Sequence, residues 1–326
     1  MKLANHYNVQ LTQKLNLTQE WDKTFPKSDA VDNTKVELVN RYGITLAADL
    51  YMPKNATENM PAIAVASPYG AVKEQAGGLY AQTLAERGFV TIVFDPSFTG
   101  ESGGNVRNVS SPDINIDDFS SAVDYLDALE VVDSNRIGVL GVCGWGCYTF
   151  PLAAMDTRVK AVVSSTMGVF DQFENSADRI EARRGLNALR SEIVSGKKVD
   201  PMITVPDIDA DSPEMLKDYY AYYRTQRGYH KRSVNSGLGW TPTTMLSHFI
   251  DDIYARADEV TQPVLLVHGD KAWSYQQSVD MLARLTNAQS KELITITGAT
   301  HCDLYDGGDH DYIPFDKIEA FFKQNL

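Results

Sequence analysis

Short apolar, β-rich runs alternate with stretches of helical spacing along the first half of this sequence. The runs cover residues 62–66, 89–94, 137–140 and 159–164. Their near-continuous apolar character is typical of parallel strands buried on both faces. The stretches between them, residues 74–87, 116–130 and 144–155, are long enough for right-handed crossover helices. The alternation predicts an α/β fold with a mostly parallel central sheet and helices on both faces.

The segments around this alternation complete the predicted architecture. Residues 36–52 alternate polar and apolar positions around Arg41-Tyr42-Gly43, which predicts an antiparallel hairpin. Strand patterns return at residues 263–268 and 293–297, and an amphipathic helix runs from residue 314 to the end. In between, the chain is polar, charged and helix-biased. We therefore expect a discontinuous core, residues 1–169 and 251–326, interrupted by a helical cap over residues 170–250.

The net charge and the cysteine content indicate which classes of partner the protein can bind and in which cellular compartment it is expected. The 326 residues carry a net charge of −13, which would repel nucleic acids and anionic membranes. Three cysteines make a disulfide framework improbable, and the amino terminus has no apolar segment typical of a signal peptide. A cytoplasmic protein without nucleic-acid or membrane partners is expected. The sequence is also compatible with a homodimer.

The motif IGVLGVCGWGCY, residues 137–148, runs from a buried strand through a glycine-rich turn into a helix. This pattern indicates a nucleophile elbow, in which the reactive residue has a strained backbone and needs small neighbours. Gly141, Gly144 and Gly146 supply that space, and Cys143 occupies the nucleophile position at a helix amino terminus that favours a thiolate. Trp145 stands where a second small residue is expected.

A free cysteine is more often a small buried hydrophobe than a nucleophile, and we keep that interpretation for Cys147 and Cys302. Cys143 differs because two partners follow it. His301, in a glycine-containing loop after a strand, is the histidine best placed to act as a base, whereas His268 more plausibly braces a turn.

Asp270 follows the strand at residues 263–268 and could orient His301, although it also fits an ordinary turn or helix-capping aspartate. Asp171 is the reserve candidate for this acid. No histidine and carboxylate pair has zinc-ligand spacing, so no metal is expected.

The loop Ser67-Pro68-Tyr69-Gly70 follows the first parallel strand and could supply half of an oxyanion hole. Tyr69 would donate through its backbone amide or its phenol, and the Gly144 amide would be the second donor. An ordinary turn aromatic is an equally good reading of Tyr69. Glu74 and Gln75, just beyond, fit first-turn capping residues.

Several of these motifs together resemble α/β hydrolases of the dienelactone-hydrolase-related group, which includes esterases, thiohydrolases and polyketide acyltransferases. The motifs are the SPYG loop followed by VKEQ, DPSFTGESGG, GVCGWG, HGDKAWS, GATHCDLYD and, in the cap, RGYHKRSVNSGLGW. The resemblance spans nearly the whole chain and implies a triad of Cys143, His301 and Asp270. The SPYG loop also resembles that of the acyl-peptidase and cocaine-esterase group, in which a tyrosine hydroxyl serves the oxyanion hole.

The expected function is hydrolysis of a carboxylic ester, lactone or thioester through a covalent acyl-enzyme, with no cofactor. Trp145, Tyr222 and Trp240 are the expected lining of an apolar acyl pocket. An acyltransferase with the same triad is one alternative. A ligand-binding protein in which Trp145 fills the site and Cys143 is inert is the other.

Overall fold

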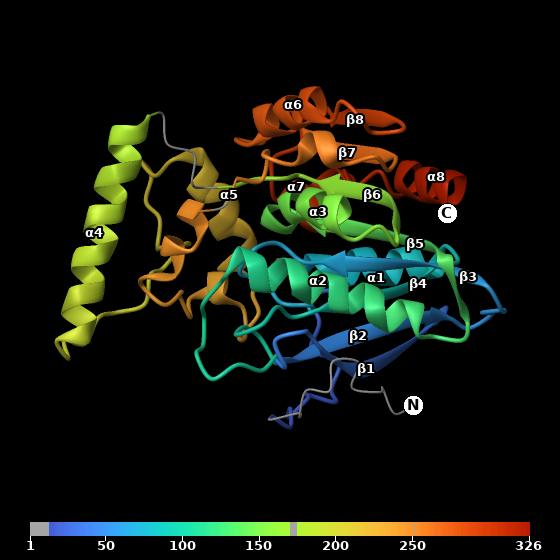
Figure 1. Ribbon diagram of the computed structural model, residues 1–326, viewed down its shortest axis with the longest axis horizontal. Helices are drawn as coiled ribbons and strands as arrows, with labels where there is room; N and C mark the ends of the chain where they lie inside the picture. The colour runs from blue at the N-terminus through green and yellow to red at the C-terminus, as the bar shows by residue number, and fades with distance from the viewer. Residues whose placement is uncertain (1–12, 170–174, 251) are drawn as a thin grey trace.

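The computed structural model describes residues 13–169, 175–250 and 252–326, and its centre is an eight-stranded sheet (Figure 1). The strands lie in the order β1-β2-β4-β3-β5-β6-β7-β8. They are β1 Val31–Val39, β2 Thr45–Pro53, β3 Met60–Ala66, β4 Val90–Phe94, β5 Val132–Val142, β6 Val159–Ser165, β7 Val264–Gly269 and β8 Lys291–Ile296. β1 and β2 form the expected hairpin and β2 is antiparallel to β4, while the remaining pairs are parallel. The predicted α/β fold is confirmed.

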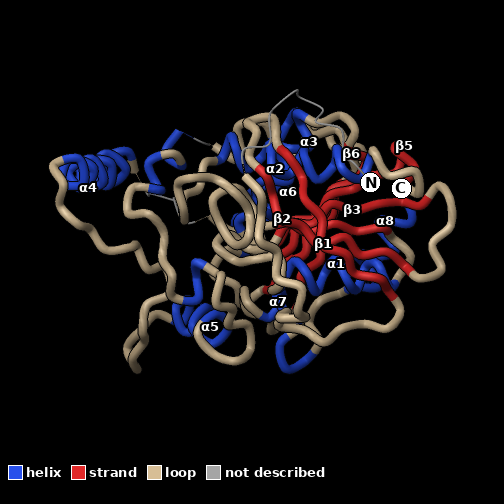
Figure 2. Tube along the Cα trace, turned by 90° about the horizontal axis from the view of Figure 1, so that it is seen from below, coloured by secondary structure: helices blue, strands red, loops and turns tan. Residues whose placement is uncertain are grey.

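Helices cover both faces of this sheet (Figure 2). One face packs on α2 Pro112–Asp127, α3 Gly144–Met155 and α6 Tyr275–Arg284, and the other on α1 Ala76–Glu86, α7 Asp303–Asp306 and α8 Phe315–Asn325. Alternation along β3 explains how one strand serves two cores. Ala62 and Ala64 face the first layer of helices, whereas Ile63 and Val65 face the second.

The chain between β6 and β7 leaves the sheet. Its described part contains α4 Ser176–Val194, α5 Glu214–Tyr223 and the short 3₁₀ helices η1 Val234–Ser236, η2 Thr244–Leu246, η3 His248–Ile250 and η4 Ala257–Glu259. A further 3₁₀ turn, η5 Gly308–His310, follows α7. Both overall views place α4 away from the sheet, and none of its residues is buried (Figures 1 and 2). Among the described residues, no helix is both long enough and apolar enough to cross a membrane.

Candidate active site

The junction of β5 and α3 has the geometry expected of a nucleophile elbow. Cys143 lies at the amino end of α3 with φ 59° and ψ −126°, a region that L residues rarely adopt. A Cβ added to Gly141 would lie 2.2 Å from the backbone oxygen of Trp145, and one added to Gly146 would lie 2.7 Å from Ser164 Oγ. The glycines of the motif are therefore required by the close approach of strand and helix.

Trp145 does not obstruct this elbow. Its side chain is 2% exposed and packs edge to face against Phe94, Phe119 and Tyr148, with ring centroids 5.4–5.9 Å apart. The ring belongs to the core between the sheet and α2 and is absent from the lining of the cavity described below. A large side chain is tolerated at this position because it points into the protein interior and away from Cys143.

The Cys143 thiol is buried among hydrogen-bond donors. Burial raises its pKa above the ordinary value, while hydrogen bonding to Tyr305, the Gly144 amide, Tyr219 and the Tyr69 amide acts in the opposite direction. The two amides are those expected of an oxyanion hole. The net direction favours a protonated thiol, so helix position alone does not produce the thiolate that the sequence suggested.

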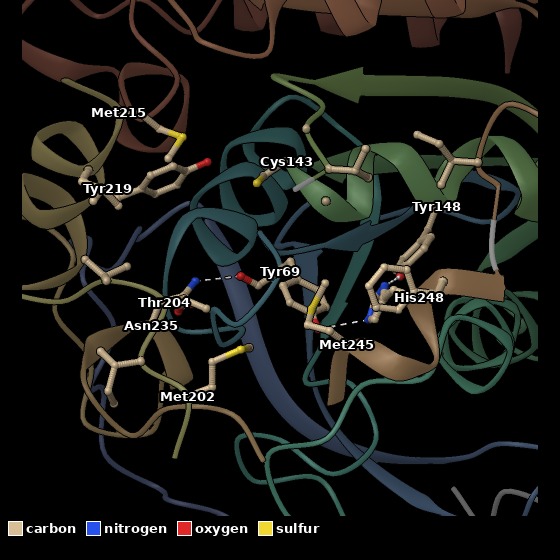
Figure 3. A pocket seen from close by; sticks show the side chains of 18 of the residues that line it. Tyr69, Cys143, Tyr148, Met202, Thr204, Met215, Tyr219, Asn235, Met245 and His248 are labelled. Carbon is tan, nitrogen blue, oxygen red and sulfur yellow. Dashed lines mark hydrogen bonds between the residues drawn. The ribbon is translucent and has the colours of Figure 1, made fainter. Parts of the chain in front are cut away.

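The Tyr69 side chain points away from Cys143 (Figure 3). Its hydroxyl lies 3.1 Å from His248 Nε2, and its ring stacks on Trp240 with a centroid separation of 4.5 Å. Burial raises the pKa of this phenol. Of the two donors that the sequence left open for Tyr69, the geometry favours the backbone amide.

Residues of the inserted segment hold the Tyr69 loop in place. Asn235 Nδ2 donates to the Tyr69 carbonyl at 2.7 Å, and Ser233 Oγ donates to the Gly70 carbonyl at 2.9 Å. Thr204 Oγ1 in turn donates to Asn235 Oδ1 at 2.7 Å. These contacts hold the two peptides that follow Tyr69, directly beyond the amide that faces Cys143, so the RGYHKRSVNSGLGW segment of the insertion contacts this loop.

His301 is fully buried next to the same aromatic side chains as Cys143. Its ring lies 5.4 Å from Tyr219 and 5.5 Å from Tyr305, and it stacks on Trp273 at 5.6 Å. Its Nδ1 is 2.9 Å from Ser274 Oγ, while its Nε2 has no hydrogen-bond partner in the described part of the chain. Burial, and then the nearby His268, lower the pKa of His301 well below its ordinary value. The imidazole is therefore neutral and has one ring nitrogen unoccupied.

The structure does not bring Asp270 to His301, which corrects the predicted contact. The side chain is exposed, and Oδ1 accepts the Gly298 amide at 2.8 Å because the turn after β7 directs it outward. The reserve candidate, Asp171, lies outside the described residues. The position next to His301 Nδ1 belongs instead to Ser274, which sequence reasoning missed. The available signal was a second polar residue, Ser274, in the same loop four positions after Asp270.

A network of buried charges lies next to the Tyr69 loop, residues 67–70, and is centred on Lys73. The Lys73 ammonium lies 2.9 Å from Asp95, 2.7 Å from Glu101 and 2.8 Å from Glu74. Glu74 also pairs with Arg232 of the insertion at 2.8 Å. The capping interpretation of Glu74 is therefore wrong: its carboxylate joins the loop after β3, the loop after β4 and the insertion. The pattern of the sequence gave no sign that these distant charges would meet.

A cavity of about 640 Å³ opens above Cys143, between the core and the inserted segment. Its lining is mostly apolar and includes three methionines, Met202, Met215 and Met245 (Figure 3). The predicted pocket residues Trp145, Tyr222 and Trp240 are not among the lining residues. Tyr222 packs against Tyr305, and Trp240 supports Tyr69 from behind. These aromatics were missassigned because composition shows which residues seek burial but not which of them face a void.

Among the described residues, no group of three or more histidine, cysteine or carboxylate side chains is arranged to hold a metal ion. The arrangement is instead a buried thiol that lines a mostly apolar cavity, with two amides directed at the thiol and a neutral imidazole buried against the same two tyrosines. The fold and these elements define an α/β hydrolase whose elbow carries a cysteine.

Comparisons with known proteins agree with this class. The chain belongs to the family described as X-Pro dipeptidyl-peptidase (S15 family), whose model matches residues 42–303. It is 50% identical to the uncharacterized protein PA2218 of Pseudomonas aeruginosa, over 96% of this chain and 86% of that one. The crystal structure of PA2218 superimposes with a TM-score of 0.89, at 48% identity over 96% of this chain and 100% of that one.

Two further relatives extend the comparison. The uncharacterized protein YcjY of Escherichia coli is 36% identical over 90% of this chain and 99% of that one. Thiohydrolase aneE of Aspergillus aculeatus is 31% identical over 40% of each chain. The predicted membership of the α/β hydrolases is confirmed.

Proposed function

We propose that this protein hydrolyses an activated acyl compound, a carboxylic ester, lactone or thioester, through a covalent acyl-enzyme on Cys143. The observation that carries the proposal is the position of the Cys143 thiol, below an apolar cavity and within hydrogen-bonding reach of the Tyr69 and Gly144 amides. The similarity of part of this chain to a protein named as a thiohydrolase supports the same class of chemistry.

In the first half-reaction, Cys143 Sγ attacks the acyl carbon while His301 Nε2 accepts the thiol proton. The carbonyl π electrons move to oxygen, and the Tyr69 and Gly144 amides donate to the resulting oxyanion. Collapse of this intermediate breaks the bond to the leaving group, which departs as an alcohol or thiol with the proton from His301. Water, deprotonated by His301, then attacks the thioester carbon and releases the carboxylic acid and the Cys143 thiol.

The cavity suits a medium-sized apolar acyl group. Its volume falls within the range of small-molecule sites, roughly 300–1,000 Å³. Methionine side chains are unbranched and adapt to ligands of different shape, so Met202, Met215 and Met245 favour tolerance of several acyl chains.

The test is a panel of aryl esters and acyl thioesters of increasing chain length, together with an Xaa-Pro anilide for the peptidase reaction. Cys143→Ala should lower the hydrolysis of the best ester or thioester by roughly 10³-fold or more. Cys147→Ala is the matched control, because Cys147 lies one turn further along α3 inside the core. Product analysis with an added thiol or alcohol separates hydrolysis from acyl transfer.

An acyl adduct on Cys143, trapped and located by mass spectrometry, is the expected intermediate. Wild-type hydrolysis that is unchanged in Cys143→Ala would refute the mechanism. A wild-type protein that cleaves no ester or thioester on the panel, whether or not it cleaves the anilide, would refute the proposed function.

A further inference from the structure

On the Nδ1 side of His301, a series of hydrogen bonds links His301, Ser274, His268 and Ser278, and we call this series the relay. His301 Nδ1 lies 2.9 Å from Ser274 Oγ, Ser274 Oγ lies 3.0 Å from His268 Nε2, and His268 Nδ1 lies 2.6 Å from Ser278 Oγ. All four side chains are buried. The geometry points to Ser274 and His268 as the residues that position His301, in place of the carboxylate of a triad. This inference rests on the proposed role of His301 as the base for Cys143.

Counting protons along the chain leaves one arrangement in which His301 can act as a base. To accept the thiol proton, Nε2 of the neutral ring must be bare, so the ring proton sits on Nδ1 and is donated to Ser274 Oγ. The Ser274 hydroxyl then donates its own proton to His268 Nε2. His268 must therefore carry its proton on Nδ1 and donate it to Ser278. Each group has one role, and the tautomer of His301 is fixed by hydrogen bonds alone.

His268 can serve as an acceptor only while it is neutral. Burial lowers its pKa to about 3, so Nε2 stays unprotonated at neutral pH. The titratable groups beside the His301 ring are His268 and the phenols of Tyr219 and Tyr305, and both phenols also form hydrogen bonds with the Cys143 thiol. Within residues 13–169, 175–250 and 252–326, no carboxylate forms a hydrogen bond or an ion pair with the His301 ring.

Two carboxylates close to the His301 loop have other partners. Asp218 accepts from Thr300 Oγ1 and from the Cys302 amide, and Asp303 pairs with Arg227.

Among the described residues no carboxylate contacts the His301 ring, and this accounts for a thiol at the nucleophile position. A carboxylate would stabilise the imidazolium that forms during attack, whereas a neutral hydroxyl stabilises it much less. His301 is consequently a weak base. A weak base can assist a thiol, with an ordinary pKa of about 8.5, far better than it can assist an alcohol. The relay therefore fits Cys143 at the position where most elbows carry serine, and Cys143→Ser should be inactive.

The experiment compares Ser274→Ala, His268→Leu and His268→Gln with the wild type, with Ser121→Ala as the matched loss of a buried serine hydroxyl outside the site. Two readouts are measured: kcat and KM on the best ester, and the rate at which iodoacetamide alkylates Cys143 as a function of pH. Peptide mapping separates Cys143 from the other two cysteines. Urea unfolding verifies that each variant is folded.

Ser274→Ala and His268→Leu should lower kcat by about 100-fold with little change in KM, because the contribution of a positioned base is lost. Alkylation of Cys143 near neutral pH should slow in the same variants. His268→Gln retains an oxygen that can accept the Ser274 proton, so it should keep clearly more activity than His268→Leu. A structural role alone would predict similar losses for both His268 variants and a change in unfolding rather than in kcat.

Asp270→Asn decides between the relay and the triad predicted from the sequence. A loss of kcat in Asp270→Asn as large as that expected for Ser274→Ala would overturn the relay, as would wild-type kcat and alkylation in Ser274→Ala. If the wild type hydrolyses nothing on the panel but Ser274→Ala still slows alkylation of Cys143, the proposed function fails and the relay stands.

Discussion

Replacing Lys73 by methionine tests how much the buried charges next to the Tyr69 loop contribute to the free energy of unfolding. The side chain is fully buried, and its ammonium lies within 3 Å of three carboxylates. Two of these have other cations: Glu74 pairs with Arg232, and Glu101 with Lys35 at 3.2 Å. Among the described residues, Asp95 has no other salt-bridge partner. The substitution therefore leaves one buried carboxylate without its ion pair and weakens the other two.

The expected loss of unfolding free energy follows from the one carboxylate, Asp95, that is left without an ion pair. Removing one partner of a buried ion pair destabilises a protein by about 3–5 kcal/mol, since the remaining charge cannot be rehydrated. Lys73→Met should lower the free energy of unfolding by about this amount, and added salt should change the effect little because buried pairs are poorly screened. The matched control is Lys217→Met, which removes the exposed pair with Glu214 and should cost less than about 0.5 kcal/mol.

Urea titration followed by fluorescence measures both variants. Asp95→Asn made in the Lys73→Met background should cost less than in the wild type, with a coupling of at least about 1 kcal/mol. The acid side of the network adds a second check. Burial alone would raise the pKa of Glu101, but Lys73 lowers it to about 2. The stabilisation that the Glu101 carboxylate gives the folded protein is therefore complete above the ordinary carboxyl pKa and is lost as the pH falls from there toward about 2. A loss below about 1 kcal/mol for Lys73→Met would refute the reasoning.

Three further predictions concern Gly141 at the elbow, the hydrogen bond from Asn235 to the Tyr69 loop, and the buried His268. Gly141→Ala should abolish folding or cost at least about 3 kcal/mol in thermal unfolding, because the new Cβ would meet the Trp145 carbonyl at 2.2 Å; Gly185→Ala, in open space on α4, should be neutral or stabilising. Asn235→Ala should lower kcat about 10-fold on the best ester, since the Tyr69 carbonyl loses the hydrogen bond that holds it next to the donor amide, and an unchanged kcat would contradict a role for this hydrogen bond. The folded pKa of His268 is depressed to about 3 from 6.5, so its contribution to stability is complete above the unfolded value and lost as pH falls. Between about pH 7.5 and 5.5, the advantage of the wild type over His268→Gln in unfolding free energy should shrink by about 1.4 kcal/mol; a constant difference would show that His268 titrates normally.

Local patterns were sufficient for the strands and for the elbow. Apolar runs bounded by turns located the parallel strands, because a strand buried on both faces has to be apolar throughout, although β5 begins at Val132, before the apolar run at residues 137–140. Cys143 was placed at the elbow by three glycines whose spacing is dictated by contact of strand and helix backbones. The hairpin of β1 and β2 followed from alternation around a glycine turn.

The third member of the site did not follow from such patterns. Asp270 and Ser274 lie in the same short loop, and which of them reaches His301 depends on how the turn after β7 is directed. Likewise, Tyr222 and Trp240 are as apolar as the true lining residues, and only their packing partners exclude them from the cavity.

The sequence by itself therefore determined the α/β fold, the cysteine elbow and the histidine loop, since each depends on residues that are close along the chain. Tertiary structure decided which side chain supports His301, which residues face the cavity, and that Lys73, Asp95 and Glu101 share one buried network. The physical reason is that hydrogen bonds and ion pairs are fixed by distances of a few ångströms between segments that the sequence keeps far apart.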